Sequence, residues 1–113
     1  MLNSGDVVDL DRGASKGREA GLKRPVVVVT AQEILDESAN VIQVVPLTSS
    51  FRGFGSEVEI RSDESNGLES DSAAQCQHIR SVSVDRVESV RGNVCVVALS
   101  EVRQVLALIL DIS

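Results

Sequence analysis

The sequence predicts a small, strongly curved β-barrel with helices added, a fold of mainly β class. Three observations lead to this prediction: short β-branched segments separated by turn residues, four consecutive valines after a proline, and a helical apolar pattern near the C-terminus. The 113 residues have the length of one domain with a single modest core, which we assign to residues 1–113.

The central element is expected at Val26–Val29, directly after Pro25. Proline can begin a strand but not occupy a paired position inside one, because it has no backbone N–H. Four β-branched residues without polar alternation predict a strand covered on both faces. Lys23 and Arg24 immediately precede it, so a cation would be held on rigid scaffold while its charged group stays free to bind a ligand.

Four further segments have the composition of strands. Pro46 implies a sheet edge or a bulge near the end of one of them. Asn66-Gly67 is a strong turn signal. The expected strands are 5–10, 41–47, 57–61 and 72–84, the last as one long or bent strand.

Helices are expected in two places, with a single helical turn between them. Thr30 would cap a short helix over 30–37, with Glu33 completing a capping box. Residues 85–90 would form one turn, and 91–93 would turn the chain toward its last segment.

The C-terminal helix is expected to be capped by Ser100, with Glu101 in its first turn. Its apolar residues recur at the spacing of one helical face. Leu108 and Leu110 widen this face beyond the need of one small domain, which indicates a dimer contact. The core-facing residues would be Val102, Val105, Leu106 and Ile109.

Composition excludes several classes of function. The net charge of −6 repels phosphate at long range, so a nucleic-acid site would have to be a local basic patch. Aromatic residues make up only 2%, which removes the stacking platforms of many single-strand binders. The sequence contains no Walker loop, nucleophile elbow, zinc-ligand spacing or dinucleotide fingerprint, so neither a metal nor another cofactor is expected.

Cys76 and Cys95 have no companion ligand pairs and no signal peptide precedes them. We expect both to be buried free thiols in a reducing compartment. The longest apolar run is too short to span a bilayer. The sequence is therefore expected to be cytoplasmic, without membrane contact.

Four motifs in order resemble the MazF/PemK family of bacterial toxin endoribonucleases. GDVVDL resembles the opening strand of the family, and KRPVVVVT resembles its signature of a basic residue, R-P and a valine-rich strand. VIQVVPLTSS resembles the strand and loop that contain P-x-T, and HIRSVSVDRV resembles the strand that begins with I-R. Each motif alone is weak, but the ordered set covers nearly the whole chain.

The resemblance implies an SH3-like small barrel of the MazF/CcdB type with a C-terminal helix, working as a homodimer. It also implies ribosome-independent, sequence-specific cleavage of single-stranded RNA (mRNA) without metal. A cognate antitoxin protein would block the RNA groove.

Residue by residue, Arg24 matches the arginine of R-P and Thr48 the threonine of P-x-T, which implies catalytic roles. Arg80 matches the arginine of the I-R strand. The sequence departs from the family where Arg18 follows Gly17 in place of serine, and where His78 stands in place of the glutamine before I-R. The residues expected to bind RNA are Gln77, His78, Arg80, Arg18, Lys23, Ser49 and Arg52.

Metal-free RNA cleavage uses the 2′-hydroxyl of the substrate as nucleophile and leaves a 2′,3′-cyclic phosphate. Arg24 can clamp phosphate oxygens, and Thr48 can donate a hydrogen bond to them. Neither is an ordinary proton shuttle, so the general base is not identified. His78, the only histidine, is open between a structural and an RNA-contacting role, with catalysis a minor option.

Two functions other than RNA cleavage are compatible with the sequence. A CcdB-like module would poison gyrase by protein contact, but it typically depends on C-terminal aromatic residues, and this sequence ends Leu-Asp-Ile-Ser. A catalytically inactive family member would only bind antitoxin. Without the resemblance, Thr48 would be interpreted as a turn residue after Pro46. The alternative for Arg24 is a surface cation at a strand entrance, although the R-P context favours function, and the default for Arg52 is a solvated surface cation rather than part of an RNA groove.

Overall fold

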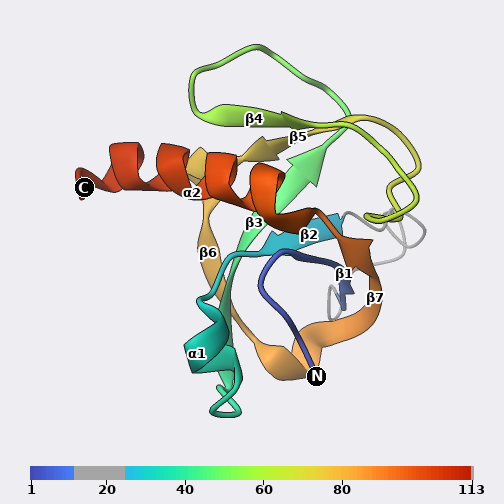
Figure 1. Cartoon of the computed structure of the whole chain (residues 1–113), viewed down its shortest axis with the longest axis vertical. Coiled ribbons are helices and arrows are strands. Elements are labelled where there is room, and N and C mark those ends of the chain that lie inside the picture. The colour runs from blue at the N-terminus through green and yellow to red at the C-terminus, as the bar shows by residue number, and fades with distance from the viewer. Residues whose placement is uncertain (12–24, 113) are drawn as a thin grey trace.

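A computed structural model describes residues 1–11 and 25–112. In this part of the chain a single antiparallel sheet carries one long helix, one short helix and two 3₁₀ turns (Figure 1). The strands are β1 (Asp6–Leu10), β2 (Pro25–Val28), β3 (Val41–Thr48), β4 (Glu57–Ile60), β5 (Ser72–Gln75), β6 (Arg80–Ser83) and β7 (Val87–Asn93). The helices are α1 (Gln32–Leu35) and α2 (Cys95–Leu110), and the 3₁₀ turns are η1 (Cys76–His78) and η2 (Val84–Arg86).

Six of the seven described strands follow the order β4-β5-β3-β2-β1-β7, and the seventh, β6, pairs with β3. β3 changes partner along its length, from β6 over residues 41–44 to β5 over 47–48. Pro46 lies at this change of partner, where the ladder on that side is interrupted and its missing N–H costs nothing. The predicted curved β fold with a C-terminal helix is confirmed, as an open sheet in which the described edge strands β4 and β7 do not pair.

Strand β2 and the residue after it are covered on both faces, as the four valines predict. Val27 and Val29 belong to the core cluster under α2, whereas Val26 and Val28 belong to a second cluster on the other side of the sheet. Complete burial of one such side chain contributes about 1.5–3 kcal/mol. One four-residue segment therefore connects both cores.

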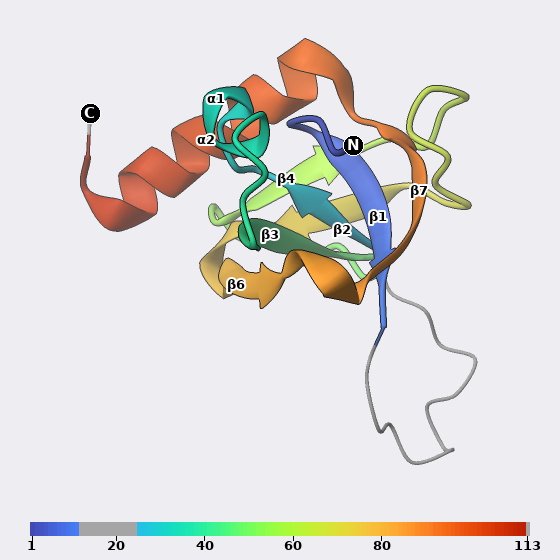
Figure 2. The same ribbon diagram turned by 90° about the horizontal axis from the view of Figure 1, so that it is seen from below.

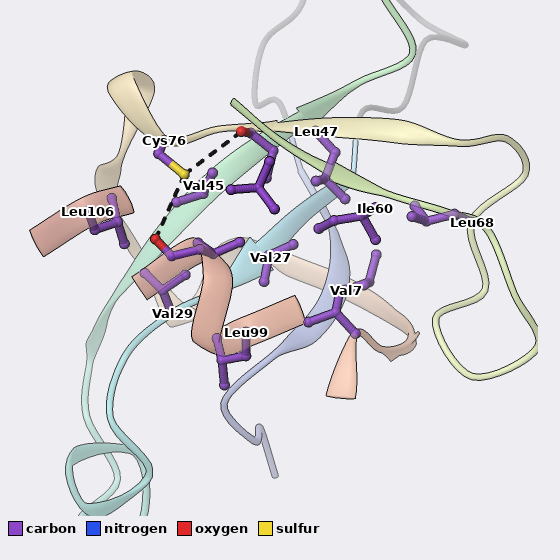
Figure 3. Close-up of a cluster of buried hydrophobic side chains, with 14 residues drawn as sticks. Val7, Val27, Val29, Val45, Leu47, Ile60, Leu68, Cys76, Leu99 and Leu106 are labelled. Carbon is purple, nitrogen blue, oxygen red and sulfur yellow. Dashed lines mark hydrogen bonds between the residues drawn. The ribbon is translucent and has the colours of Figure 1, made fainter. Parts of the chain in front are cut away.

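Helix α2 covers the first core cluster (Figures 1 and 3). Leu99, Val102 and Leu106 are buried against the sheet, and Val105 packs at the margin. Ile109 is largely exposed, which corrects its predicted place in the core.

The predicted start of this helix at Ser100 is wrong, because α2 begins at Cys95. Asn93 Oδ1 accepts the N–H of Cys95 at 2.7 Å and so satisfies one donor at the start of the helix. Residues 91–93, expected to form a turn, instead complete strand β7.

Three shorter elements also differ from expectation. Helix α1 covers four residues, and Thr30 does not cap it, because the Thr30 hydroxyl accepts the N–H of Gln43 at 2.8 Å. The long strand expected over 72–84 is two strands separated by η1. The helical turn expected over 85–90 is η2 followed by the start of β7. In each case a contact distant in sequence overrides the local pattern.

The two cysteines are both free but lie in different environments. Cys76 is buried in the first core, where its thiol lies 3.8 Å from the carbonyl of Ala74 and 3.9 Å from that of Val102 (Figure 3). Cys95 is exposed, so its predicted burial is wrong. Burial raises the pKa of the Cys76 thiol from 9.0 to about 11, against a smaller lowering by a backbone hydrogen bond.

The raised pKa of Cys76 predicts a loss of stability in alkali. Between pH 9 and about 11 the thiol ionises in the unfolded chain but stays protonated in the folded one, so the free energy of unfolding falls as pH rises. Urea unfolding of the wild type and Cys76→Ala should show the wild type losing roughly 1–3 kcal/mol more between pH 8 and 11. Cys95→Ala is the control. An unchanged difference between wild type and Cys76→Ala across this range would contradict the assignment.

Candidate functional site

A cleft of about 320 Å³ lies at the C-terminal end of β3, and we call it the Thr48 cleft. Two of the predicted site residues, Thr48 and Ser49, line it, and so does Pro25, which directly follows Arg24 in the sequence. Arg24, Lys23 and Arg18 lie outside the described residues. The complete lining is Pro25, Leu47, Thr48, Ser49, Ser50, Leu68, Glu69, Ser70, Ser72 and Arg91.

The hydroxyl of Thr48 is held at the point where β3 ends. Its Oγ1 accepts the backbone N–H of Ser50 at 3.1 Å. A hydroxyl that accepts one hydrogen bond still has its own hydrogen to donate. Thr48, the last residue of β3, therefore satisfies a backbone donor of the turn that follows and keeps a hydroxyl hydrogen that it can donate at the margin of the cleft.

Arg91 lines the same cleft, although it was not predicted from the sequence as a site residue. Its guanidinium contacts the buried carboxylate of Asp9, with NH2 3.0 Å from Oδ1 and Nε 3.1 Å from each oxygen. The hydroxyl of Ser89 also donates to Asp9, at 3.1 Å. A charge-assisted fork of this kind fixes the position of the guanidinium. The available sequence signal was the aspartate inside the apolar strand GDVVDL, which required a partner.

A second cleft, of about 340 Å³, contains two other predicted residues, His78 and Arg80. We call it the His78 cleft. Two arginines and a histidine line it, and no carboxylate is among the described lining residues, so the lining carries local positive charge in an acidic chain. Its lining is Leu10, Val26, Pro46, Gln75, His78, Arg80 and Arg86.

The two clefts are lined by different residues of the β2–β3 pair. Pro25, Leu47 and Thr48 line the first cleft, whereas Val26 and Pro46 line the second. The structure therefore brings Thr48 and Ser49 together, and His78 and Arg80 together, but not all four into one cleft.

The remaining predicted residues lie outside both clefts. Gln77 is exposed in η1, next to His78. Arg52 is exposed in the β3–β4 loop, where its backbone N–H donates to Glu57 Oε1 at 3.0 Å. Arg86, which was not predicted as a site residue, does line the His78 cleft. Its guanidinium donates to the carbonyl of Asp11, from Nε at 2.9 Å and from NH2 at 2.6 Å.

Residues 1–11 and 25–112 contain neither a candidate metal site nor a candidate membrane span. No group of three or more histidine, cysteine or carboxylate side chains is placed there to hold a metal ion. No helix in this part of the chain is long and apolar enough to cross a membrane.

Residues 3–110 match the family described as PemK-like, MazF-like toxin of type II toxin–antitoxin system. The chain belongs to this family. The endoribonuclease MazF9 of Mycobacterium tuberculosis (strain ATCC 25618 / H37Rv) is 30% identical over 116 residues, covering 99% of the chain and 98% of the relative. The resemblance found in the four motifs is thereby confirmed.

Solved structures of the PemK/MazF toxin family have the same fold. An endoribonuclease in complex with its cognate antitoxin, from a mycobacterial species, has a TM-score of 0.78 at 17% identity, covering 100% of this chain and 98% of that one. MazE–MazF (form II) of Deinococcus radiodurans has a TM-score of 0.76 at 24% identity, covering 99% of this chain and 97% of that one.

The Asp9–Arg91 pair predicts a measurable loss of stability when its charge is removed. Asp9→Asn keeps the shape of the side chain but leaves a partly buried guanidinium without its anion. The free energy of unfolding should fall by about 1–3 kcal/mol. Urea unfolding measures this, with Glu101→Gln on the exposed face of α2 as control. Equal stability of Asp9→Asn and the wild type would show that the pair contributes nothing.

Proposed function

We propose that the chain is the toxin of a type II toxin–antitoxin pair and acts as an endoribonuclease. Its substrate would be single-stranded RNA, mRNA above all, cut at a specific sequence without the ribosome. The observation that supports this most is family membership over residues 3–110, together with a Thr48 cleft lined by Pro25, the residue that follows Arg24 in the sequence. The relative that is 30% identical carries the name endoribonuclease.

The proposed chemistry needs no metal. The 2′-hydroxyl of the substrate attacks the adjacent phosphorus, the 5′-oxygen of the next nucleotide leaves, and a 2′,3′-cyclic phosphate remains. Arg24 stabilises the charge that develops on the phosphorane, and the free hydrogen of the Thr48 hydroxyl donates to the same oxygens. Arg91 supplies a second positive charge on the wall of the cleft, attenuated by Asp9.

The other predicted residues are proposed as contacts to RNA away from the cut. His78 and Arg80 offer a second cleft, with positive charge, for a phosphate or a base away from Thr48. Ser49 lines the Thr48 cleft itself. The remaining proposed contacts are Arg18, Lys23, Arg52 and Gln77.

The proposed partners are a cognate antitoxin and a second copy of the chain, in the cytoplasm. The antitoxin follows from the family and from related toxins solved with theirs. The dimer is supported by α2, where Leu108 is 76% exposed and Leu110 55%. An apolar groove of about 420 Å³ also lies along this helix, lined by Val96, Leu99, Ser100, Arg103, Gln104 and Ala107.

The alternatives are less well supported. A CcdB-like gyrase poison is not favoured, because the chain matches the PemK/MazF toxins over residues 3–110. An inactive member would keep the same fold and still bind antitoxin. Cleavage of RNA by the purified protein separates this last alternative from the proposal.

The proposed chemistry is tested with purified protein, a long single-stranded RNA and EDTA, reading the fragment ends by primer extension. Discrete cuts are expected from the wild type, and cyclic phosphate at the fragment ends. Arg24→Ala and Thr48→Val should each cut roughly 10²–10³-fold more slowly, because each loses one stabilising donor. Thr48→Ser keeps the hydroxyl and should retain most of the rate.

The matched control is Arg61→Ala, which removes an exposed arginine at the end of β4. Its cleavage rate should equal that of the wild type. Thermal unfolding confirms that each variant is folded. Undiminished cutting by folded Arg24→Ala and Thr48→Val would remove both residues from the mechanism, and intact RNA with the wild type would overturn the proposed function.

The proposed dimer is tested by sedimentation equilibrium. Leu108→Lys places a charge on the exposed apolar face of α2 and should convert the dimer into a monomer without unfolding it. Val41→Lys is the control, because Val41 is an exposed apolar residue like Leu108 but lies on β3, away from the apolar face of α2. A monomeric wild type would contradict the dimer, and a dimeric Leu108→Lys protein would place the interface elsewhere.

A further inference from the structure

The loop between β3 and β4, residues 49–56, carries the only two aromatic residues of the sequence. Phe51 and Phe54 are each 53% exposed, whereas both cores consist of valine, leucine, isoleucine and other small apolar side chains. In Figure 1 this loop extends beyond the strands at the top of the view. The chain thus places its only large π-surfaces in contact with solvent, and one arginine, Arg52, stands between them.

The loop is held at its base by Glu57, the first residue of β4. Glu57 is 8% exposed, and its Oε1 accepts the backbone N–H of Arg52 at 3.0 Å. The backbone N–H of Glu57 donates to the carbonyl of Phe54, also at 3.0 Å. Glu57 Oε2 is buried and has no hydrogen-bond partner among the described residues, which is unfavourable for stability. The two hydrogen bonds of Glu57 tie Arg52 and Phe54 of the loop to the start of β4.

The outer part of the loop is open. Gly53 has φ +75°, a conformation that favours glycine, and a side chain at Gly53 or Gly55 would meet nothing within 4 Å. The turn between the two phenylalanines therefore has open space beside its glycines, as far as the described residues are concerned. The rings themselves are each about half exposed to solvent.

The loop is continuous with the Thr48 cleft. Ser49 and Ser50 line that cleft, and Phe51 follows directly. A phosphate bound at Thr48 would therefore place the neighbouring bases of its strand near the rings. Bases stack on aromatic side chains irrespective of their sequence, and arginine adds charge and a further planar surface.

We propose that Phe51, Arg52 and Phe54 form a stacking platform for bases of single-stranded RNA next to the cleaved phosphate, and that Glu57 positions this platform. The proposal rests on the proposed function and deepens it. It also reverses the sequence-based expectation that so few aromatics leave no platform. Stacking of one base on one ring changes affinity by about 5- to 150-fold.

Direct binding is tested with tryptophan as a probe, because the chain contains no Trp or Tyr. Phe54→Trp introduces the only indole, and its fluorescence is followed during titration with a single-stranded 2′-O-methyl oligonucleotide, which lacks the nucleophile and is not cut. Quenching is expected with the single strand, but not with the same strand in a duplex or with polyphosphate. Val96→Trp, exposed on α2, is the matched control and should not respond.

Cleavage kinetics test the same platform in the reaction. Phe51→Ala and Phe54→Ala should raise KM for RNA by about 5- to 150-fold each and change kcat by less than about 3-fold. Phe→Leu at either position should behave like Ala, and Phe→Trp like the wild type, if stacking rather than apolar contact is responsible. Both sites are exposed, so the variants should keep the thermal stability of the wild type.

The positioning role of Glu57 has its own test. Glu57→Ala loses the acceptor for Arg52 N–H and should raise KM, whereas Glu57→Gln keeps an oxygen acceptor and should restore it. A purely structural role would instead lower thermal stability in both variants without this split.

The outcomes separate the platform from the proposed function. Cutting by the wild type with unchanged KM in both Phe→Ala variants overturns the platform alone. Absence of cutting by the wild type overturns the proposed function, and the oligonucleotide titration then still decides the platform. A response of Phe54→Trp to the cognate antitoxin but not to the oligonucleotide would assign the loop to a protein partner and overturn the proposal.

Discussion

The burial of one short strand on both faces is the constraint on which the rest of the structure depends. Val26 and Val28 face one core, and Val27 faces the other. Neither core can be assembled without fixing β2 and the strands paired to it, β1 and β3. The same constraint positions Pro25 and the end of β3, so the Thr48 cleft forms where two paired strands meet the loops that follow them.

Much of this could be predicted from the sequence, because the decisive signals are local. Four valines after a proline specify a doubly covered strand without any knowledge of its partners. The start of α2 could not be found in the same way. Asn93 joins the helix to β1 and the N-terminal turn, donating to Ser4 O at 2.9 Å and to Asp6 Oδ1 at 3.0 Å while accepting from Cys95. Ser100 had the better local pattern, but no tertiary contact supported it.

For the candidate site, too, local motifs could be seen in the sequence but contacts distant in sequence could not. Thr48 was predicted from a motif and His78 from a departure from one, but that they line different clefts depends on the fold around β3 and on η1, which separates β5 from β6. Arg91 and Arg86 were missed because their partners, Asp9 and the carbonyl of Asp11, are more than 70 residues away in sequence. Contacts between residues so far apart leave no periodic signal in a single sequence.

The acidic composition and the proposed RNA substrate are compatible once charge is considered by location. The net charge of −6 repels phosphate as a whole. In physiological salt, however, charges more than about 8–10 Å from a bound phosphate are largely screened, so the local charges decide the interaction. Within that range the His78 cleft presents Arg80 and Arg86. Stacking on Phe51 and Phe54 adds attraction that does not depend on net charge. An acidic protein can therefore bind a single strand tightly at one place while repelling nucleic acid elsewhere, which favours specific over non-specific binding.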